Sequence, residues 1–175
     1  MPNWCSNRLS VFGSTKKLQE FVSMGRPMDT ADKSELKLHS LFPMPKDLED
    51  TKSPVDRPNP TFIRKYGFDN WYDWKVANWG VKWDIDAQME DMRDVSNPHV
   101  TYVFDTAWGP PDKWLKEIAH RWPALKFELE FIELCMNFCG QLIYENGEVL
   151  VDESRDANKE DYYNWGFDME EEEAA

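Results

Sequence analysis

The chain has 175 residues, of which 41% are hydrophobic and 14% aromatic, a length and composition that allow a buried core and exclude a disordered chain. Its 33 acidic and 20 basic residues give a net charge of −13 at pH 7, which argues against sequence-independent binding to DNA or RNA, because lysines and arginines must neutralise the phosphates. Residues 1–12 lack the pattern of a secretory signal and no segment has the ~20 apolar residues of a membrane span, so we expect a soluble cytoplasmic protein.

The first predicted elements are a strand and a helix. Over residues 4–12, apolar Leu9 and Val11 alternate with polar residues, which is typical of a half-buried strand. A helix is expected to follow, because Ser14 can cap its first turn and apolar residues recur at helical spacing until Gly25.

The next part of the chain is predicted to be an insertion between core elements. Residues 28–70 have no clear periodicity and contain five prolines, which remove backbone donors and restrict the residue before them. We expect mostly irregular structure there, with short helical turns. Residues 70–83 are rich in aromatic side chains, and their apolar spacing favours a short helix that ends near Gly80.

A hairpin is predicted after the insertion. The pattern of residues 85–95 fits a strand or a helix, whereas residues 99–108 read clearly as a strand. We prefer a strand for residues 85–95, because Asn97-Pro98 is a turn signal that would let the two segments pair.

The last predicted elements are a helix and three strands. Residues 112–122 carry one apolar stripe, which predicts a helix, and residues 125–131 alternate apolar and polar side chains as a strand does. Two short strands, 141–144 and 148–151, flank Asn146-Gly147, which is a strong hairpin signal.

The resulting order of strand, helix, strand, strand, helix, strand is that of the ferredoxin-like α+β fold, βαββαβ with an antiparallel sheet. We therefore expect one such domain over residues 1–151, with a proline- and tryptophan-rich insertion at residues 28–84 and an added C-terminal hairpin. Residues 152–175 hold ten acidic and two basic residues and are expected to form a flexible acidic tail. Four aromatic residues could dock part of this tail, namely Tyr162, Tyr163, Trp165 and Phe167.

Several motifs resemble those of the YubB-type ferredoxin-like domain family, also called Api92-like proteins. They are MPNWCSNRLSVFG at the start of the chain, ANWGVKWD at residues 77–84, FDTAWGPP at residues 104–111, and Phe138-Cys139-Gly140. The resemblance extends from Met1 to about Val151. Because members of this family occur in bacteriophages and plasmids, it implies a mobile-element protein that acts in the bacterial cytoplasm. It carries over no catalytic or binding residues.

Neither a metal nor a cofactor is predicted. Cys135 and Cys139 have C-x3-C spacing, but a zinc site needs four ligands and the other candidates are scattered. Three cysteines are too few for an iron–sulfur cluster held by four, and unpaired thiols fit a reducing cytoplasm. The scattered candidates are Cys5, His39, His99 and His120.

An enzyme is not the favoured interpretation, because the chain contains none of the common nucleophile, zinc-protease or phosphate-loop motifs. One run of acidic residues could hold a divalent ion through oxygen ligands, although its spacing is not that of a calcium-binding loop and a solvated strand face is preferred. The run consists of Asp84, Asp86, Glu90, Asp91 and Asp94.

Eight of the nine tryptophans divide into an expected core set and a candidate binding set, and the ninth, Trp165, lies in the tail. Most of them should be buried, because each covers a large apolar area, and those assigned to the core are Trp4, Trp74, Trp108, Trp114 and Trp122. In residues 70–83, aromatic rings could stack on bases or cap a peptide while a lysine supplies charge. The candidate binding residues there are Trp71, Trp79, Lys82 and Trp83.

The acidic tail supplies a second candidate site, formed by Glu170, Glu171, Glu172 and Glu173. Such a run is usually a solubilising end. A sharper hypothesis is that the tail and the acidic strand faces imitate phosphates and block a basic, nucleic-acid-binding protein. We therefore expect a non-enzymatic protein-interaction module of a bacteriophage or plasmid, which binds a host bacterial protein with a basic surface and antagonises host defence or nucleic-acid binding. The alternatives are a single-stranded nucleic-acid binder that uses exposed aromatics, and a small metal-dependent hydrolase or nuclease.

Overall fold

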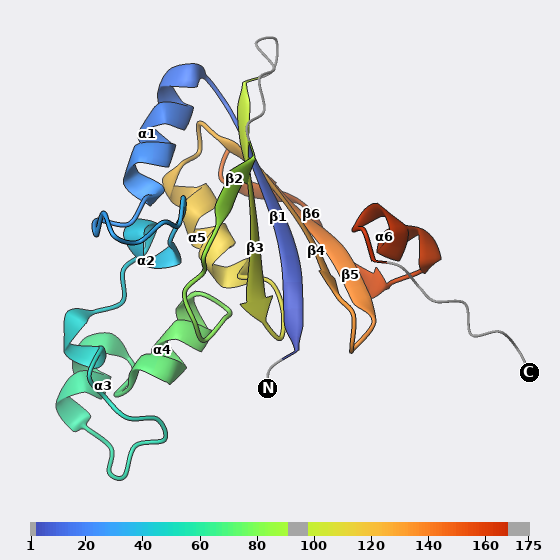
Figure 1. Cartoon of the computed structure of the whole chain (residues 1–175). Helices are drawn as coiled ribbons and strands as arrows, with labels where there is room; N and C mark the ends of the chain where they lie inside the picture. The colour runs from blue at the N-terminus through green and yellow to red at the C-terminus, as the bar shows by residue number, and fades with distance from the viewer. Residues whose placement is uncertain (1–2, 91–97, 168–175) are drawn as a thin grey trace, which may run out of the picture.

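The computed structural model describes residues 3–90 and 98–167, and it contains one six-stranded antiparallel sheet with the order β2-β3-β1-β4-β5-β6 (Figure 1). The strands are β1 (Trp4–Phe12), β2 (Gln88–Glu90), β3 (His99–Ala107), β4 (Lys126–Glu133), β5 (Phe138–Glu145) and β6 (Glu148–Asp156). The helices are α1 (Thr15–Gly25), α2 (Leu38–Leu41), the 3₁₀ turn η1 (Lys46–Leu48), α3 (Pro60–Tyr66), α4 (Trp71–Asn78), α5 (Asp112–Arg121) and α6 (Lys159–Asn164). The predicted α+β class and antiparallel sheet are confirmed.

Local sequence signals account for the central elements. β1 spans the predicted residues and pairs with β3 on one side and β4 on the other. The side chain of Ser14 accepts a hydrogen bond from the Lys17 backbone N–H at the start of α1, as its position before the helix predicts. Of residues 85–95, for which a strand was preferred over a helix, Gln88–Glu90 form β2, which pairs with β3. Residues 91–97, which include the turn signal at Asn97, lie outside the described residues.

The main core lies between one face of the sheet and the helices α1, α2 and α5, which Figure 1 shows on the same side. Side chains alternate along β1, so that Leu9 and Val11 enter this core while Arg8 and Ser10 lie on the opposite face. We call that opposite face the open face. Phe21 of α1, fully buried, makes an edge-on contact with Phe127 of β4 across the core.

The insertion after α1 is more than a surface loop. Its backbone contains only short helical segments, as predicted, but Leu36, Leu38 and Leu48 are completely buried in the main core. The indole N–H of Trp114 in α5 donates to the carbonyl oxygen of Leu38 at 3.0 Å. The insertion therefore completes the helical layer that covers the sheet.

The C-terminal hairpin is longer than predicted. Its turn is at Asn146 and Gly147, both with positive φ, as expected for an Asn-Gly hairpin. β6 then continues to Asp156, and α6 follows, so residues 152–167, assigned to a loose tail on composition, are part of the fold. The residues Glu170–Glu173 lie outside the described part of the chain.

Helix α6 packs against the open face at the β4–β5 side of the sheet, where Figure 1 shows it opposite α1 and α5. Tyr162 is buried against Ile132 and Cys139, and Trp165 and Phe167 pack at the margin of this second cluster. The sequence left open whether the aromatic residues of the predicted tail dock part of it on the domain. The structure confirms such docking for three of these four residues. Tyr163 is the exception, because 80% of it is exposed.

Among the described residues, no helix is long and apolar enough to cross a membrane.

Candidate interaction surface

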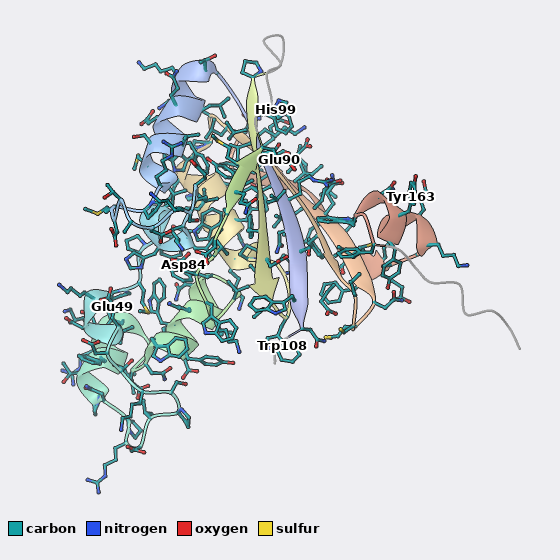
Figure 2. The ribbon with its side chains drawn as sticks, in the orientation of Figure 1. Glu49, Asp84, Glu90, His99, Trp108 and Tyr163 are labelled. Carbon is teal, nitrogen blue, oxygen red and sulfur yellow. The ribbon has the colours of Figure 1, made fainter. Side chains whose placement is uncertain are left out.

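Three tryptophans lie half-exposed at one end of the sheet. Trp4 begins β1, Trp108 follows β3, and Trp83 precedes β2, with exposed fractions of 51%, 50% and 41%. The rings of Trp4 and Trp83 have centroids 6.0 Å apart, and the Trp108 backbone N–H donates to the carbonyl oxygen of Asn3 at 2.9 Å. Figure 2 shows Trp108 at this end of β3. The prediction that Trp4 and Trp108 belong to the core is therefore wrong.

Lys82 is part of the same cluster. Its ammonium nitrogen lies 3.9 Å from the centroid of the Trp83 ring, well within the range of a cation–π contact. Trp83 thus contacts Lys82 and the tilted ring of Trp4 and still keeps two-fifths of its surface exposed. The predicted binding residues Lys82 and Trp83 are accordingly brought together with Trp4, which the sequence had assigned elsewhere.

Trp108 has a backbone conformation that its side chain disfavours. Its φ is 76°, in the left-handed region that costs a residue with a β-carbon roughly 1–2 kcal/mol. Buried polar groups hold the adjoining chain. The Asn7 amide donates to the Thr106 hydroxyl at 2.8 Å, and that hydroxyl donates to the Gly109 carbonyl oxygen at 2.7 Å. Costly local geometry that the surrounding structure enforces is a feature of binding and active sites.

Two further apolar side chains are exposed at the same end. Leu134 and Met136 belong to the turn between β4 and β5, with exposed fractions of 37% and 60%. The register places Glu133 opposite Cys5, so this turn follows β4 beside the start of β1. We call the surface formed by Trp4, Trp83, Trp108, Leu134 and Met136 the tryptophan end. Exposed apolar side chains gathered at one end of a sheet mark an interaction site more often than scattered single residues do.

The other residues of the predicted aromatic site lie elsewhere. Trp79 is completely buried and donates its indole N–H to the Phe42 carbonyl oxygen at 2.9 Å, so it is a core residue. Trp71 is half-buried on α4. Lys75 lies over both rings, 5.6 Å from Trp71 and 4.9 Å from Trp79, and burial lowers its pKa.

The structure buries only some of the tryptophans that were expected in the core. Trp74 and Trp114 are buried, as predicted. Trp122 is half-buried and makes an edge-on contact with Phe21. For Trp4 a signal was present: it precedes inward-facing Cys5 in an alternating strand, which places Trp4 on the open face. For Trp108, no local pattern indicates a left-handed conformation.

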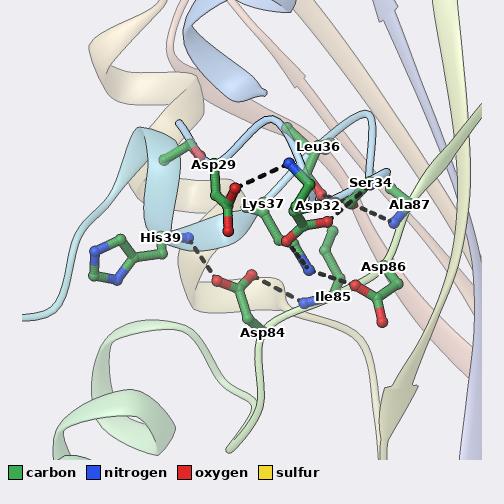
Figure 3. Close-up of polar contacts among 12 residues, drawn as sticks. Asp29, Asp32, Ser34, Leu36, Lys37, His39, Asp84, Ile85, Asp86 and Ala87 are labelled. Carbon is green, nitrogen blue, oxygen red and sulfur yellow. Dashed lines mark hydrogen bonds and ion pairs between the residues drawn. The ribbon is translucent and has the colours of Figure 1, made fainter. Parts of the chain in front are cut away.

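The acidic run at residues 84–94 does not form a metal site among the described residues, where no group of three or more His, Cys, Asp or Glu side chains could hold an ion. Asp84 instead accepts from the Leu38 backbone N–H at 2.7 Å and so caps α2, and Asp86 forms an ion pair with Lys37 (Figure 3). Figure 2 shows Glu90 on β2, away from Asp84. Asp91 and Asp94 lie outside the described residues.

The cysteines are dispersed as well. Cys5 and Cys139 are buried and Cys135 is exposed. Burial raises the pKa of Cys5 to about 12, which makes its thiol unreactive.

The open face carries more acidic than basic groups. Asp105 and Glu153 are exposed there, and two of its basic side chains each pair with an acid. Arg8 pairs with Glu130 at 3.7 Å, and Lys126, at the start of β4, pairs with Glu128 at 2.7 Å. Between Trp4 and Phe12 the open-face positions of β1 hold only Ser6, Arg8 and Ser10. Between its ends, β1 therefore presents no aromatic side chain of its own on the open face, unlike the central strands with which RNA-binding sheets stack bases.

Two comparisons with known proteins gave a match, one to a solved structure and one to a family model. No curated protein matches this chain. The crystal structure of a protein api92 from Yersinia pseudotuberculosis is similar, with a TM-score of 0.50 and 11% identity over 90% of this chain and 99% of that one, a likeness that concerns the fold alone. A family model described as the ferredoxin-like domain in Api92-like protein matches residues 79–175, which is more than half of the chain. The chain therefore belongs to the Api92-like family.

Proposed function

We propose that this protein is a non-enzymatic protein-interaction module and that the tryptophan end is its docking surface. The observation that carries the proposal is the contact of half-exposed tryptophans at one end of the sheet, with Trp108 held in a costly conformation. Tryptophan is enriched among the residues that dominate binding energy at protein interfaces. The scaffold in this proposal is a βαββαβ core with the insertion at residues 28–84 and the added hairpin.

The partner is a host bacterial protein with a basic surface. The net charge of −13 and the excess of acids on the open face would steer such a protein toward the sheet. Glu170–Glu173 would add to this field. A phage or plasmid protein with these properties could occupy the nucleic-acid-binding surface of a host enzyme and antagonise it, including one that acts in host defence.

The test is a quantitative pull-down from nuclease-treated bacterial lysate with three baits. They are the wild type, the double variant Trp4→Ser/Trp83→Ser, and the control Tyr163→Ser, which removes an exposed ring on α6 (Figure 2). We expect a basic protein to be enriched by the wild type and the control and reduced at least tenfold with the double variant. Purified partner should then slow alkylation of Cys135, which lies between Leu134 and Met136.

The same variants distinguish the competing explanations. Equal recovery with all three baits would show that the tryptophan end does not bind the partner. Quenching of tryptophan fluorescence by single-stranded oligonucleotides at physiological salt, lost in the double variant, would instead favour nucleic acid as the ligand, because Lys82 and Trp83 offer a charge and a stacking surface.

A further inference from the structure

Strand β6 is a long outer edge of the sheet. It has nine residues and pairs within the described chain only with β5, whereas the opposite edge, β2, has three residues. An outer strand presents backbone N–H and C=O groups to which another strand can pair. Proteins commonly protect such edges with short strands, prolines, lysines or β-bulges. β6 contains neither a proline nor a lysine, and a register shift at Leu150 divides its pairing with β5 into two regular stretches.

The side chains of β6 divide the strand into two halves. Val149 and Leu150 in the first half have exposed fractions of 50% and 58%. Asp152, Glu153 and Asp156 in the second half are exposed acids. The strand thus offers an apolar stretch followed by a negatively charged one.

A second copy of this chain fits the edge poorly. Antiparallel pairing of two β6 strands over their full length would place Asp152 opposite Asp152 of the second copy and Glu148 opposite Asp156. Like charges directly opposite each other destabilise a strand pair. The charge of the strand instead complements a segment that carries lysine or arginine.

A cavity beside β6 supports the same partner chemistry. It has a volume of about 560 Å³, lies between the open face and α6, and is lined by Glu130, Glu153 and Trp165 among others. Arg155 is already neutralised by Asp161, through two hydrogen bonds of 2.6 and 2.7 Å. The Arg8 guanidinium lies 4.9 Å from the centre of the Trp165 ring, so a cation already packs on this wall.

We propose that β6 binds an extended basic segment of a partner protein, which adds to the sheet as a seventh strand. Backbone hydrogen bonds along the edge would provide affinity, as in other cases of strand addition. Apolar side chains of the segment would cover Val149 and Leu150, and a lysine or arginine would enter the cavity beside Glu153 and Trp165. This inference depends on the proposed function in one respect: the segment belongs to the protein partner proposed there.

The experiment uses a fluorescently labelled nine-residue peptide designed to pair with β6. Its valines would lie opposite the apolar half of the strand, and its lysines would lie opposite the acidic residues Glu148, Asp152, Glu153 and Asp156. Fluorescence anisotropy should show binding at least tenfold tighter than that of a peptide of the same composition in scrambled order. Asp152→Lys/Glu153→Lys should weaken binding at least tenfold, whereas the charge-matched control Glu49→Lys/Asp50→Lys, on the insertion (Figure 2), should change it less than twofold.

Hydrogen exchange of the wild type separates strand addition from simple charge attraction. Bound peptide should slow exchange of β6 amides at least tenfold and leave α1 amides unchanged. Equal binding of the ordered and scrambled peptides, or unchanged β6 exchange at saturation, would overturn the inference. The variant Trp4→Ser/Trp83→Ser should bind the peptide as the wild type does. A negative result for peptide binding at β6 can therefore be told apart from a negative result for partner binding at the tryptophan end.

Discussion

Trp108 combines an unfavourable backbone conformation with a half-exposed indole ring, and these two properties predict an unusual mutational result. Trp108→Ala and Trp108→Gly both remove the ring, but only glycine relaxes the backbone at φ 76°. We expect the glycine variant to be the more stable of the two by about 1 kcal/mol, whereas in most ordered positions alanine is preferred. Urea unfolding measures the difference in stability. If the alanine variant were as stable as the glycine variant or more stable, the backbone at residue 108 would not be strained.

Gly140 is required by the close packing of three strands. A β-carbon there would lie 2.2 Å from the Glu153 carbonyl oxygen and 2.5 Å from the Phe131 ring. Gly140→Ala should therefore destabilise the fold by about 1–3 kcal/mol, since the backbone oxygen cannot move away without breaking pairing. Gly109→Ala is the matched control, because a β-carbon at Gly109 meets nothing within 4 Å, and its unfolding midpoint in urea should stay close to that of the wild type.

At the scale of single residues, composition predicts less than position does. The area argument assigns most tryptophans to the core, and it holds for Trp74 and Trp114. It fails for Trp4 because helices α1, α2 and α5 cover only one face of β1, and the tryptophan points to the other. It fails for Trp108 because the end of β3 and its polar support depend on contacts with β1, which are distant in sequence.

Among the elements, α6 depends on polar contacts at its first turn. Asn158 and Asp161 form a reciprocal capping box, and Arg155 donates two hydrogen bonds to Asp161. Arg155 and the backbone N–H of Asn158 lower the pKa of Asp161 from 3.8 to about 2. A carboxylate with a lowered pKa stabilises the fold above its unfolded pKa, and this contribution is lost as the pH falls toward 2.

Asp161→Asn should therefore destabilise the protein at pH 7 by about 1 kcal/mol, the usual scale for an acid at a helix start. The difference from the wild type should shrink between pH 4 and pH 2, because the wild-type carboxylate is protonated in that range. Urea unfolding at several pH values measures it, with the exposed Asp156→Asn as control. A difference that persists unchanged at pH 2 would show that the charge of Asp161 is unimportant.

Elements with strong local signals are predictable from the sequence, and those defined by distant contacts are not. The alternation of β1, the cap of α1 and the Asn146-Gly147 turn identify their elements directly. β2 was ambiguous because its three residues acquire a strand conformation only by pairing with β3. α6 was missed because the charge of residues 152–175 outweighed the capping signal at Asn158.

At the scale of the whole molecule, the insertion and the sheet form one core. Leu36, Leu38 and Leu48 of the insertion are completely buried in the same cluster as Phe21 of α1 and Phe127 of β4. For residues 28–70, where these three leucines lie, the sequence indicates only irregular structure, because the apolar residues there follow no clear helical or strand period. Their burial depends on contacts with the sheet, α1 and α5, which are distant in sequence and which no local pattern reveals.

This shared core predicts that the insertion unfolds together with the sheet. Leu38→Ala removes a completely buried side chain of the main core, so it should lower the free energy of unfolding by about 2–5 kcal/mol. The control is Met28→Ala, at a fully exposed residue of the insertion, which should change stability little. Tryptophan fluorescence and far-UV circular dichroism should give coincident urea midpoints for both variants, because a single cooperative unit has one transition. If Leu38→Ala shifted the fluorescence midpoint alone, the insertion would unfold separately and the tryptophan end would rest on a less rigid scaffold than the structure implies.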